Sequence, residues 1–549
     1  MTVPVLAGDD EGVTSLAGDD ESVTSGALTE RESVRALRAA VAARKWQHAV
    51  DIIDVRWPSL MHDGEDGLDD LLRQIPVQYF RSRIKAFVVR DIRLQERTEE
   101  ADRAFRRFRA TLPEDTTTLD SIGASKSVVG ALGTAAALMI AFRVRGQFDL
   151  ATRYADVFER LGRTGIVHQT GNVAPRMPAG MLQVGIARTL TGDTGAAVIA
   201  LQEAYETAHR TTARHVRRDA AGKLALVYAL SGDLDVADGW LRRYRDASEI
   251  DGWLKPRVAL GADLAAGLIA VDRLDRKRAD WALARVRQGV DEEQIWGVGV
   301  SVLRSRFDLL WGDRHRALRR IGEDRLRYAR VLSQHTIMSD LLDAVEVDLT
   351  LSLRQGHRAS EIIHGLADNV TARIARARWK LLTGDLPGAR GAIAVIEAGE
   401  LPTRQRTEAL ALRVATEPTD AASQELMDAI DHTGALWHLA ALPAAVRDRA
   451  SAEDVRAAEP LDLAREMFPA EVEFVALTGQ ENEMLACIAQ NKKLKQIAQE
   501  LHLSPNTVKT HMRTLYTKLR ARNRTEALAA AGRVGLLDSL RADEGSGNG

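Results

Sequence analysis

Apolar residues recur at intervals of three and four along most of the chain, which is the spacing of one face of an α-helix. Between about residues 29 and 445 this pattern continues with much Ala, Leu and Arg and only scattered Pro. Strict alternation of apolar and polar positions, which a half-buried strand would show, is almost absent. The chain is therefore predicted to be all-α over this region.

A short turn pattern divides the helical region into repeating units. A turn Gly, often followed by Asp, stands five positions before an Ala. The pattern occurs at Gly146, Gly192, Gly232, Gly312 and Gly384. Versions without the Gly precede Ala49, Ala101 and Ala279. A left-handed Gly closes one helix, Asp can cap the next, and a small Ala lets the two pack closely. A spacing of about 40 residues predicts stacked helix hairpins.

This turn resembles that of tetratricopeptide repeats, and the longer, irregular period is more similar to the repeats in the sensor region of MalT-like regulators. The resemblance implies an α-solenoid over residues 29–445 that acts as a sensor or interaction domain. A generic helical array with accidental similarity is the alternative.

Other features of the sequence indicate which segments are disordered and where in the cell the protein is found. The acidic, duplicated tail 1–28 and the terminal residues 539–549 are expected to be disordered. No basic segment followed by an apolar run opens the chain, so no secretory signal is expected. The stretch 127–142 has 16 residues, which is short for a membrane span, and is predicted to be a buried helix. A single cysteine, Cys487, fits a reducing, cytoplasmic location without disulfides.

After a polar connector, residues 446–470, the segment 471–538 is predicted to form four short helices. Thr478 and Glu481 make a capping box before the first helix, and Ser504 caps the third with Pro505 at its first position. The third helix has a polar, cationic face. Its apolar face carries Val508, Met512, Leu515 and Leu519, and its polar face carries Asn506, Lys509, Thr510 and Arg513.

Charge separates this segment from the rest of the chain. Residues 477–537 hold five Lys and five Arg against four Glu, a balance of +6, whereas the whole chain carries −2. A basic module on a mildly acidic body is typical of a protein in which one part touches nucleic acid. Two short helices, a tight turn and a helix with one basic face make a helix-turn-helix.

The segment also resembles the LuxR-type DNA-binding domain. The matching residues are Leu477, Thr478, Glu481, Glu483, Ile497, Ala498, Leu501, Ser504, Thr507, Val508, Lys509, His511, Lys518, Leu519, Arg524, Glu526, Ala527 and the closing Gly-Leu-Leu. Three positions depart from the family pattern: Gln480 stands in place of Arg, Asn491 in place of Gly, and Cys487 at a core position that is often Leu. Asn tolerates the left-handed cap, and Cys487 is expected to act as a small buried hydrophobe.

The resemblance implies roles for individual residues. Base edges would be read by Lys509, Thr510 and Arg513, with Asn506 as a weaker candidate. Phosphates would be contacted by Thr507, Lys495, Lys518 and Arg524. The face of the fourth helix resembles the family's dimerisation surface. It consists of Ala527, Leu528, Ala531 and Val534.

The chain is accordingly interpreted as a bacterial transcription regulator that binds double-stranded DNA as a homodimer. Its helical repeats would respond to a protein or small-molecule effector, and RNA polymerase is an expected partner. No enzyme activity, cofactor or metal site is predicted, since the phosphate-binding motif G-x-x-x-x-G-K-[ST] is absent. The rival interpretation is an interaction scaffold with a vestigial DNA module. All nine Trp lie in the repeat region, either lining a ligand groove or filling the core.

Overall fold

The computed structural model describes residues 30–62, 67–94, 103, 105–106, 128–168, 173–211, 213–286, 294–450, 460–462, 464–475 and 477–537. The tails 1–28 and 539–549 and the turn before Ala101 lie outside these residues. Every regular element of the described chain is helical, so the prediction of an all-α protein is confirmed.

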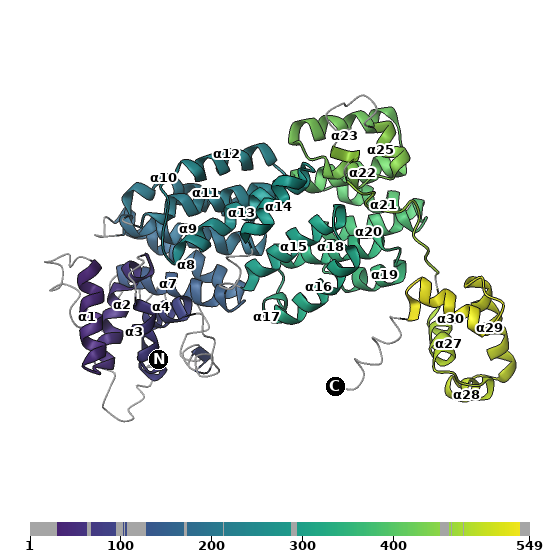
Figure 1. Cartoon of the computed structure of the whole chain (residues 1–549), viewed down its shortest axis with the longest axis horizontal. Coiled ribbons are helices and arrows are strands. Elements are labelled where there is room, and N and C mark those ends of the chain that lie inside the picture. The colour runs from purple at the N-terminus through teal and green to yellow at the C-terminus, as the bar shows by residue number, and fades with distance from the viewer. Residues whose placement is uncertain are drawn as a thin grey trace, which may run out of the picture. The chain divides into compact units, whose positions relative to one another are not determined.

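Most of the helices come in successive pairs that are joined by short turns (Figure 1). The helices that precede the C-terminal module are α1 Glu30–Ala42, α2 Trp46–His62, α3 Leu68–Gln74, α4 Ile84–Leu94, α7 Val128–Val144, α8 Phe148–Val167, α9 Met177–Thr191, α10 Thr194–Glu206, α11 His215–Ser231, α12 Leu234–Asp246, α13 Leu254–Asp272, α14 Arg276–Val286, α15 Gln294–Leu310, α16 Arg314–Arg327, α17 Ala329–Leu332, α18 Ile337–Ser352, α19 Gly356–Gly365, α20 Val370–Leu382, α21 Leu386–Glu397, α22 Thr403–Thr416, α23 Asp420–Thr433, α24 Trp437–Ala440 and α25 Ala444–Ala450. Short 3-10 segments lie at Val77–Ser82, Ala174–Arg176 and Ala208–Arg210.

The chain divides into two compact units. One contains the described residues up to Arg188 together with 199–220 and 248–255, and the other contains the remainder. Within the first unit, α1 packs on α2, α2 on α4, α4 on α7 and α7 on α8. Within the second, α15 packs on α18, α18 on α20 and α20 on α22, while each of these helices also packs on the helix that follows it. The packing of helix pairs in sequence order is what stacked hairpins require.

The predicted turns are largely confirmed. Gly146, Gly192, Gly232 and Gly384 have φ between 71° and 90°, the left-handed region that favours glycine. Gly312 is an exception without a positive φ, so the prediction was wrong for that turn. The turn there is followed instead by Asp313, whose side chain accepts a hydrogen bond from the backbone N–H of Arg316 and caps α16.

The turns that lack a regular Gly use other residues in the left-handed region. Arg44, Leu274 and Arg354 have φ of 53°, 58° and 62° and each ends the first helix of a pair. The Arg354 turn was not recognised in the sequence. The Ala that follows each described turn is fully buried, as close helix packing requires. These residues are Ala49, Ala151, Ala197, Ala237, Ala279, Ala317, Ala359 and Ala389.

Helix α7 covers the apolar stretch that was predicted to be a buried helix, and thirteen of its residues are buried. Within the described part of the chain, no helix has the length and apolar character that a membrane crossing needs. The tryptophans divide between core and surface. Trp240, Trp296, Trp311 and Trp437 are buried, whereas Trp281 is 55% exposed. Core filling therefore accounts for several of them.

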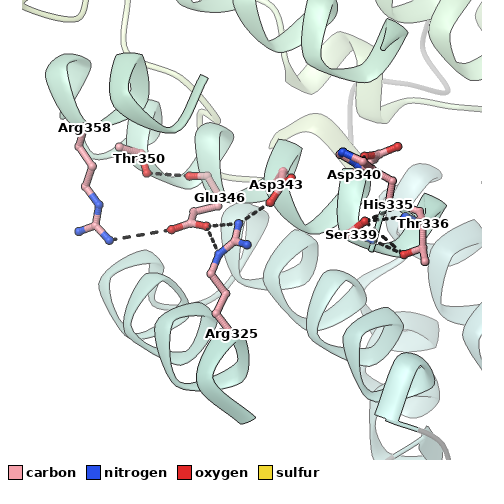
Figure 2. A network of polar contacts seen from close by, with 9 residues as sticks. All are labelled: Arg325, His335, Thr336, Ser339, Asp340, Asp343, Glu346, Thr350 and Arg358. Atoms are coloured by element: carbon pink, nitrogen blue, oxygen red, sulfur yellow. Dashed lines mark hydrogen bonds and ion pairs between the residues drawn. The ribbon is translucent and has the colours of Figure 1, made fainter. Parts of the chain in front are cut away.

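Ion pairs tie neighbouring helices together in the second unit. In one cluster, Arg325 of α16 reaches Asp343 and the buried Glu346 of α18, and Arg358 of α19 approaches the same Glu346 (Figure 2). Thr336 caps α18 through a reciprocal pair of hydrogen bonds with Ser339 (Figure 2). These contacts hold α16, α18 and α19 in one arrangement.

A second ion-pair cluster is fully buried. Asp272, at the end of α13, is 0% exposed and accepts hydrogen bonds from Arg306 at 2.6 Å and from Arg404 at 2.6 and 3.2 Å. Burial acts to raise the pKa of Asp272, but the two guanidinium groups outweigh it and hold the pKa below its usual value. Nearby, burial and the positive field of Arg404 lower the pKa of His438 to about 3, so this imidazole is neutral.

Candidate nucleic-acid interface

The C-terminal module consists of four short helices, of which the first and third begin directly after their predicted caps. They are α27 Gly479–Ala489, α28 Leu494–Glu500, α29 Pro505–Lys518 and α30 Arg524–Arg533. Thr478 and Glu481 form the capping box of α27, with hydrogen bonds of 3.3 and 2.7 Å. Ser504 caps α29 by accepting the Thr507 N–H at 3.1 Å, and Asn523 caps α30. These local signals explain why the helix boundaries could be predicted.

One hydrophobic core joins the four helices. Its members include Met484, Leu485 and Ile488 of α27, Ile497 of α28, and Val508 and Leu515 of α29, all at most 1% exposed. The remaining buried members are Cys487, Ala498, Leu519, Ala527, Ala530, Ala531, Val534 and Leu536. The apolar face predicted for α29 is confirmed, with Met512 half-buried at its edge. The core therefore fixes which side of α29 faces solvent.

The polar face of α29 is exposed to solvent in the described part of the chain. Asn506, Lys509, Thr510 and Arg513 are all exposed. Among the described residues, neither Lys509 nor Arg513 forms an ion pair, and the Thr510 hydroxyl donates to the Asn506 carbonyl one turn back. Two unpaired cations about one turn apart on a helix that a compact core presents to solvent can donate to guanine O6 and N7 in a major groove.

The four candidates for phosphate contact differ in their surroundings. Lys495 is exposed, and Thr507 is half-buried with its hydroxyl 2.8 Å from that of Ser504. The Lys518 ammonium is held by the buried Glu481 carboxylate at 2.6 Å. Burial of Glu481 acts to raise its pKa, but hydrogen bonds from Lys518 and Thr478 lower it below the usual value.

Arg524 also has a role inside the module. Its guanidinium donates to the backbone carbonyls of Ile488 and Lys492, at 2.9 Å for Lys492, and so satisfies the end of α27. The contacts of Lys518 and Arg524 both join segments more than 30 residues apart in the sequence. Phosphate binding by either residue remains a prediction, and each has a structural role besides.

The candidate dimer face lies mainly inside the module. Ala527 and Ala531 are 0% exposed and Val534 is 4% exposed, and all three belong to the core described above. Leu528 is half-buried, which leaves it as the predicted dimer residue with most access to solvent. Dimerisation through α30 stays a prediction.

The departures from the family pattern are accommodated locally. Asn491 has φ 62°, the left-handed conformation expected of a residue in place of Gly. Cys487 is 3% exposed, and burial raises the pKa of its thiol, so it behaves as a buried hydrophobe. Gln480 is exposed. The loop before α30 presents two further exposed cations, Arg520 and Arg522, to which the sequence assigned no role.

This geometry is that of a helix-turn-helix module. Residues 475–531 match the family described as bacterial regulatory proteins, luxR family, so the chain carries a LuxR-family helix-turn-helix domain at its C-terminus. Over 62 residues it is 45% identical to the "Probable transcriptional regulatory protein NarL" of Mycobacterium tuberculosis, covering 11% of this chain and 29% of that protein. Over 64 residues it is 47% identical to the "Nitrate/nitrite response regulator protein NarP" of Escherichia coli, covering 12% and 30%. The matches span less than a third of these relatives.

The segment just before α27 is fixed to α19 and α20 by backbone and aromatic contacts. The Val475 N–H donates to His357 Nε2 at 3.0 Å, and the Val472 N–H donates to the Leu382 carbonyl at 2.8 Å. Phe474 stacks on the His357 ring and meets Trp379 edge-on, with ring centres 4.6 and 5.0 Å apart. We call residues 472–475 the docked strap.

A glycine makes room for the docked strap. A Cβ at Gly356 would lie 2.8 Å from the Glu473 carbonyl oxygen and 2.9 Å from Val472 Cγ1, which is closer than real Cβ contacts come. We expect Gly356→Ala to displace the strap and to increase amide hydrogen exchange at residues 472 and 475. Gly365→Ala, at the other end of the same helix with no atom within 4 Å, is the matched control and is expected to leave exchange unchanged. Equal exchange in the two variants would contradict the close approach.

Protonation of His357 should release the same strap. Burial lowers the pKa of His357 to about 4, from its ordinary value of 6.5. Because the folded pKa is depressed, docking should be fully stabilised above pH 6.5 and weaken as the pH falls toward 4. The protection factor of the Val475 amide, corrected for intrinsic exchange at each pH, measures this loss. His357→Gln should remove the dependence, and a pH profile unchanged in that variant would assign it to another group.

Proposed function

We propose that the chain is a sequence-specific, DNA-binding transcription regulator. The observation that supports this most is the exposed, unpaired pair Lys509 and Arg513 on α29, within a module that matches the luxR family. An α-helix fits the major groove, where Lys and Arg discriminate guanine from other bases. Thr510 and Asn506 lie on the same face and complete the proposed reading surface, while Lys495 and Thr507 would set its register on phosphates.

The regulator acts as a dimer on a two-fold operator, through α30 with Leu528 at its accessible edge. Two copies of α29 would then enter successive major grooves on one side of the duplex. RNA polymerase is the partner through which a bound regulator would change transcription.

The helical body is a tetratricopeptide-like, MalT-like solenoid that controls the module. Sequential packing of helix pairs in the second unit supports a repeat array, and the left-handed turns with buried Ala support a common hairpin unit. The docked strap supports coupling, since it fixes the segment just before α27 to α19 and α20. An effector that binds one arrangement of the body better than another would increase the population of that arrangement, and so would change how freely the DNA-binding module moves.

Selection of binding sites from a random double-stranded DNA library with the full-length protein tests the proposal. We expect an enriched motif with two-fold symmetry, bound about 10³-fold or more tightly than shuffled DNA at the same salt concentration. A library that remains random after repeated rounds, together with capture of one stoichiometric protein partner from cell extract, would favour the scaffold interpretation instead.

A further inference from the structure

A cavity of about 40 Å³ lies within the second unit, among α15, α18, α20, α22 and α24. By this measure it has room for about three water molecules, or for a small polar head group. Apolar side chains such as Val302 and Ile374 form part of its wall. Thr371, Gln405 and Glu408 are half-buried members of the lining, so the cavity reaches the surface on their side.

The lining offers hydrogen-bond donors that none of the described residues accepts from. Arg306 is 6% exposed; its guanidinium bonds to Asp272 and covers the Trp437 ring, but its Nε has no partner among the described residues. Arg378, also 6% exposed, makes its hydrogen bond through Nη1 to Asp348. Two guanidinium groups with spare N–H donors suit a carboxylate.

Acceptors are available on the opposite helix. Gln405 Oε1 on α22 is buried without a partner, and the Glu408 carboxyl one turn later makes no hydrogen bond among the described residues. Burial raises the pKa of Glu408 because Arg378 and Arg404 compensate its charge only in part. A ligand ammonium beside Glu408 would complete that compensation.

The charges of the lining nearly cancel. Three arginines of the lining, including the fully engaged Arg404, face the lining acids Asp348 and Glu408, and Asp272, which lies outside the lining, is bonded to Arg306 and Arg404 and balances the third positive charge. A simple anion would therefore add uncompensated negative charge to the cavity, and a simple cation would add uncompensated positive charge. A zwitterion, which carries both charges on separate groups, would keep the cavity neutral.

We infer that this cavity binds a free amino acid, with its carboxylate held by Arg306 and Arg378 and its ammonium held by Glu408 and Gln405. This inference names the class of effector for the regulator proposed above. The role of the amino acid as an effector rests on that proposal, whereas its binding to the cavity does not depend on it.

Arg378 also links the cavity to the segment that leads to the DNA module. Its guanidinium lies over the Phe468 ring at 5.4 Å, and Phe468 is 2% exposed. Two hydrogen bonds fix the stretch just before Phe468. The Arg314 guanidinium donates to the Glu466 carbonyl, and the Arg465 backbone N–H donates to the Leu310 carbonyl at the end of α15. A carboxylate that draws Arg378 toward the cavity changes the support beneath Phe468. Bound amino acid is therefore expected to alter amide exchange at residues 467–475.

Isothermal titration calorimetry of the full-length protein, without DNA, tests the site. Glycine and then the other proteinogenic amino acids are the probes, with acetate and methylamine as the separate halves of glycine. We expect at least one amino acid to bind with a Kd below about 1 mM and each half alone to bind about 100-fold more weakly. Failure of every amino acid, or acetate binding as tightly as the best amino acid, would overturn the inference without touching the DNA-binding proposal.

A pair of charge-removing variants locates the binding. Glu408→Gln is expected to weaken binding of the best amino acid about tenfold or more, whereas the exposed Glu400→Gln is expected to leave it unchanged. Should Glu408→Gln lower the melting temperature, Ala344→Leu, which adds bulk to a half-buried part of the wall, provides the same test. Unchanged affinity in a folded Glu408→Gln or Ala344→Leu protein would place the ligand elsewhere.

Discussion

Full-length protein with Lys509→Ala and Arg513→Ala together is expected to bind its selected operator at least about 100-fold more weakly, because each good contact to a base edge is worth about 1–3 kcal/mol. Both side chains are exposed and outside the core of the module, so the substitutions remove contacts to DNA and leave the fold intact. The measurement is the affinity for operator and for shuffled DNA at two salt concentrations, in which the loss should concentrate on the operator.

The matched control for this variant is Lys495→Ala. Lys495 is exposed on α28 and proposed to contact phosphate, so its loss should weaken binding to all DNA alike and reduce the slope of affinity against salt by about one ion. Lys518 is a poorer control, because removing it also strands the buried Glu481 carboxylate. Equal loss on operator and shuffled DNA in the double variant would contradict the assignment of base reading to α29.

The second large effect concerns stability. Asp272→Asn is expected to lower the free energy of unfolding by roughly 3–5 kcal/mol, since it leaves the buried Arg306 and Arg404 guanidinium groups with uncompensated charge. All three groups are at most 6% exposed, so solvent cannot take over from the carboxylate. Urea-induced unfolding followed by circular dichroism measures the change.

Asp368→Asn provides the comparison for this prediction. Asp368 pairs with Arg373 and Arg376 at the surface, where water and salt already screen the charges. We expect no measurable change in unfolding for this variant. If Asp272→Asn unfolded at the same urea concentration as Asp368→Asn, the buried cluster would not stabilise the fold in the way described.

Local features of the C-terminal module could be predicted from its sequence. The caps at Thr478 and Ser504 act within three residues, and the two faces of α29 follow from helical spacing, so both kinds of signal are contained in a short window. The Asn523 cap of α30 acts over the same distance but was not recognised in the sequence. The left-handed turns of the repeats belong to the same class, with Gly312 as the exception, because Asp313 can cap the next helix without a left-handed residue before it.

Contacts between distant segments could not be predicted in this way. The Lys518 and Glu481 pair, the Arg524 bonds to the end of α27, and the Val475 bond to His357 join residues 32 to 118 positions apart. Helical periodicity gives the face on which a side chain lies and says nothing of its partner on another helix. For that reason the sequence predicted only phosphate contacts for Lys518 and Arg524. The cavity between α15 and α22 could not be predicted from the sequence at all.

The same distinction explains the candidate dimer face. Ala527, Ala531 and Val534 share one stripe of α30, and the sequence shows that this stripe is apolar. Whether such a stripe packs inside its own module or against another copy depends on how α27 and α30 come together. The structure places all three in the core, which leaves Leu528 as the position to vary in a test of dimerisation.

The measurement that tests the central claim most directly is genome-wide chromatin occupancy of the full-length protein, beside the Lys509→Ala, Arg513→Ala variant at equal expression. A sequence-specific regulator is expected to give sharp peaks that share a two-fold motif and that disappear in the variant. Peaks that persist unchanged in the variant, or occupancy that equals background under every growth condition in which the protein is present, would contradict the claim.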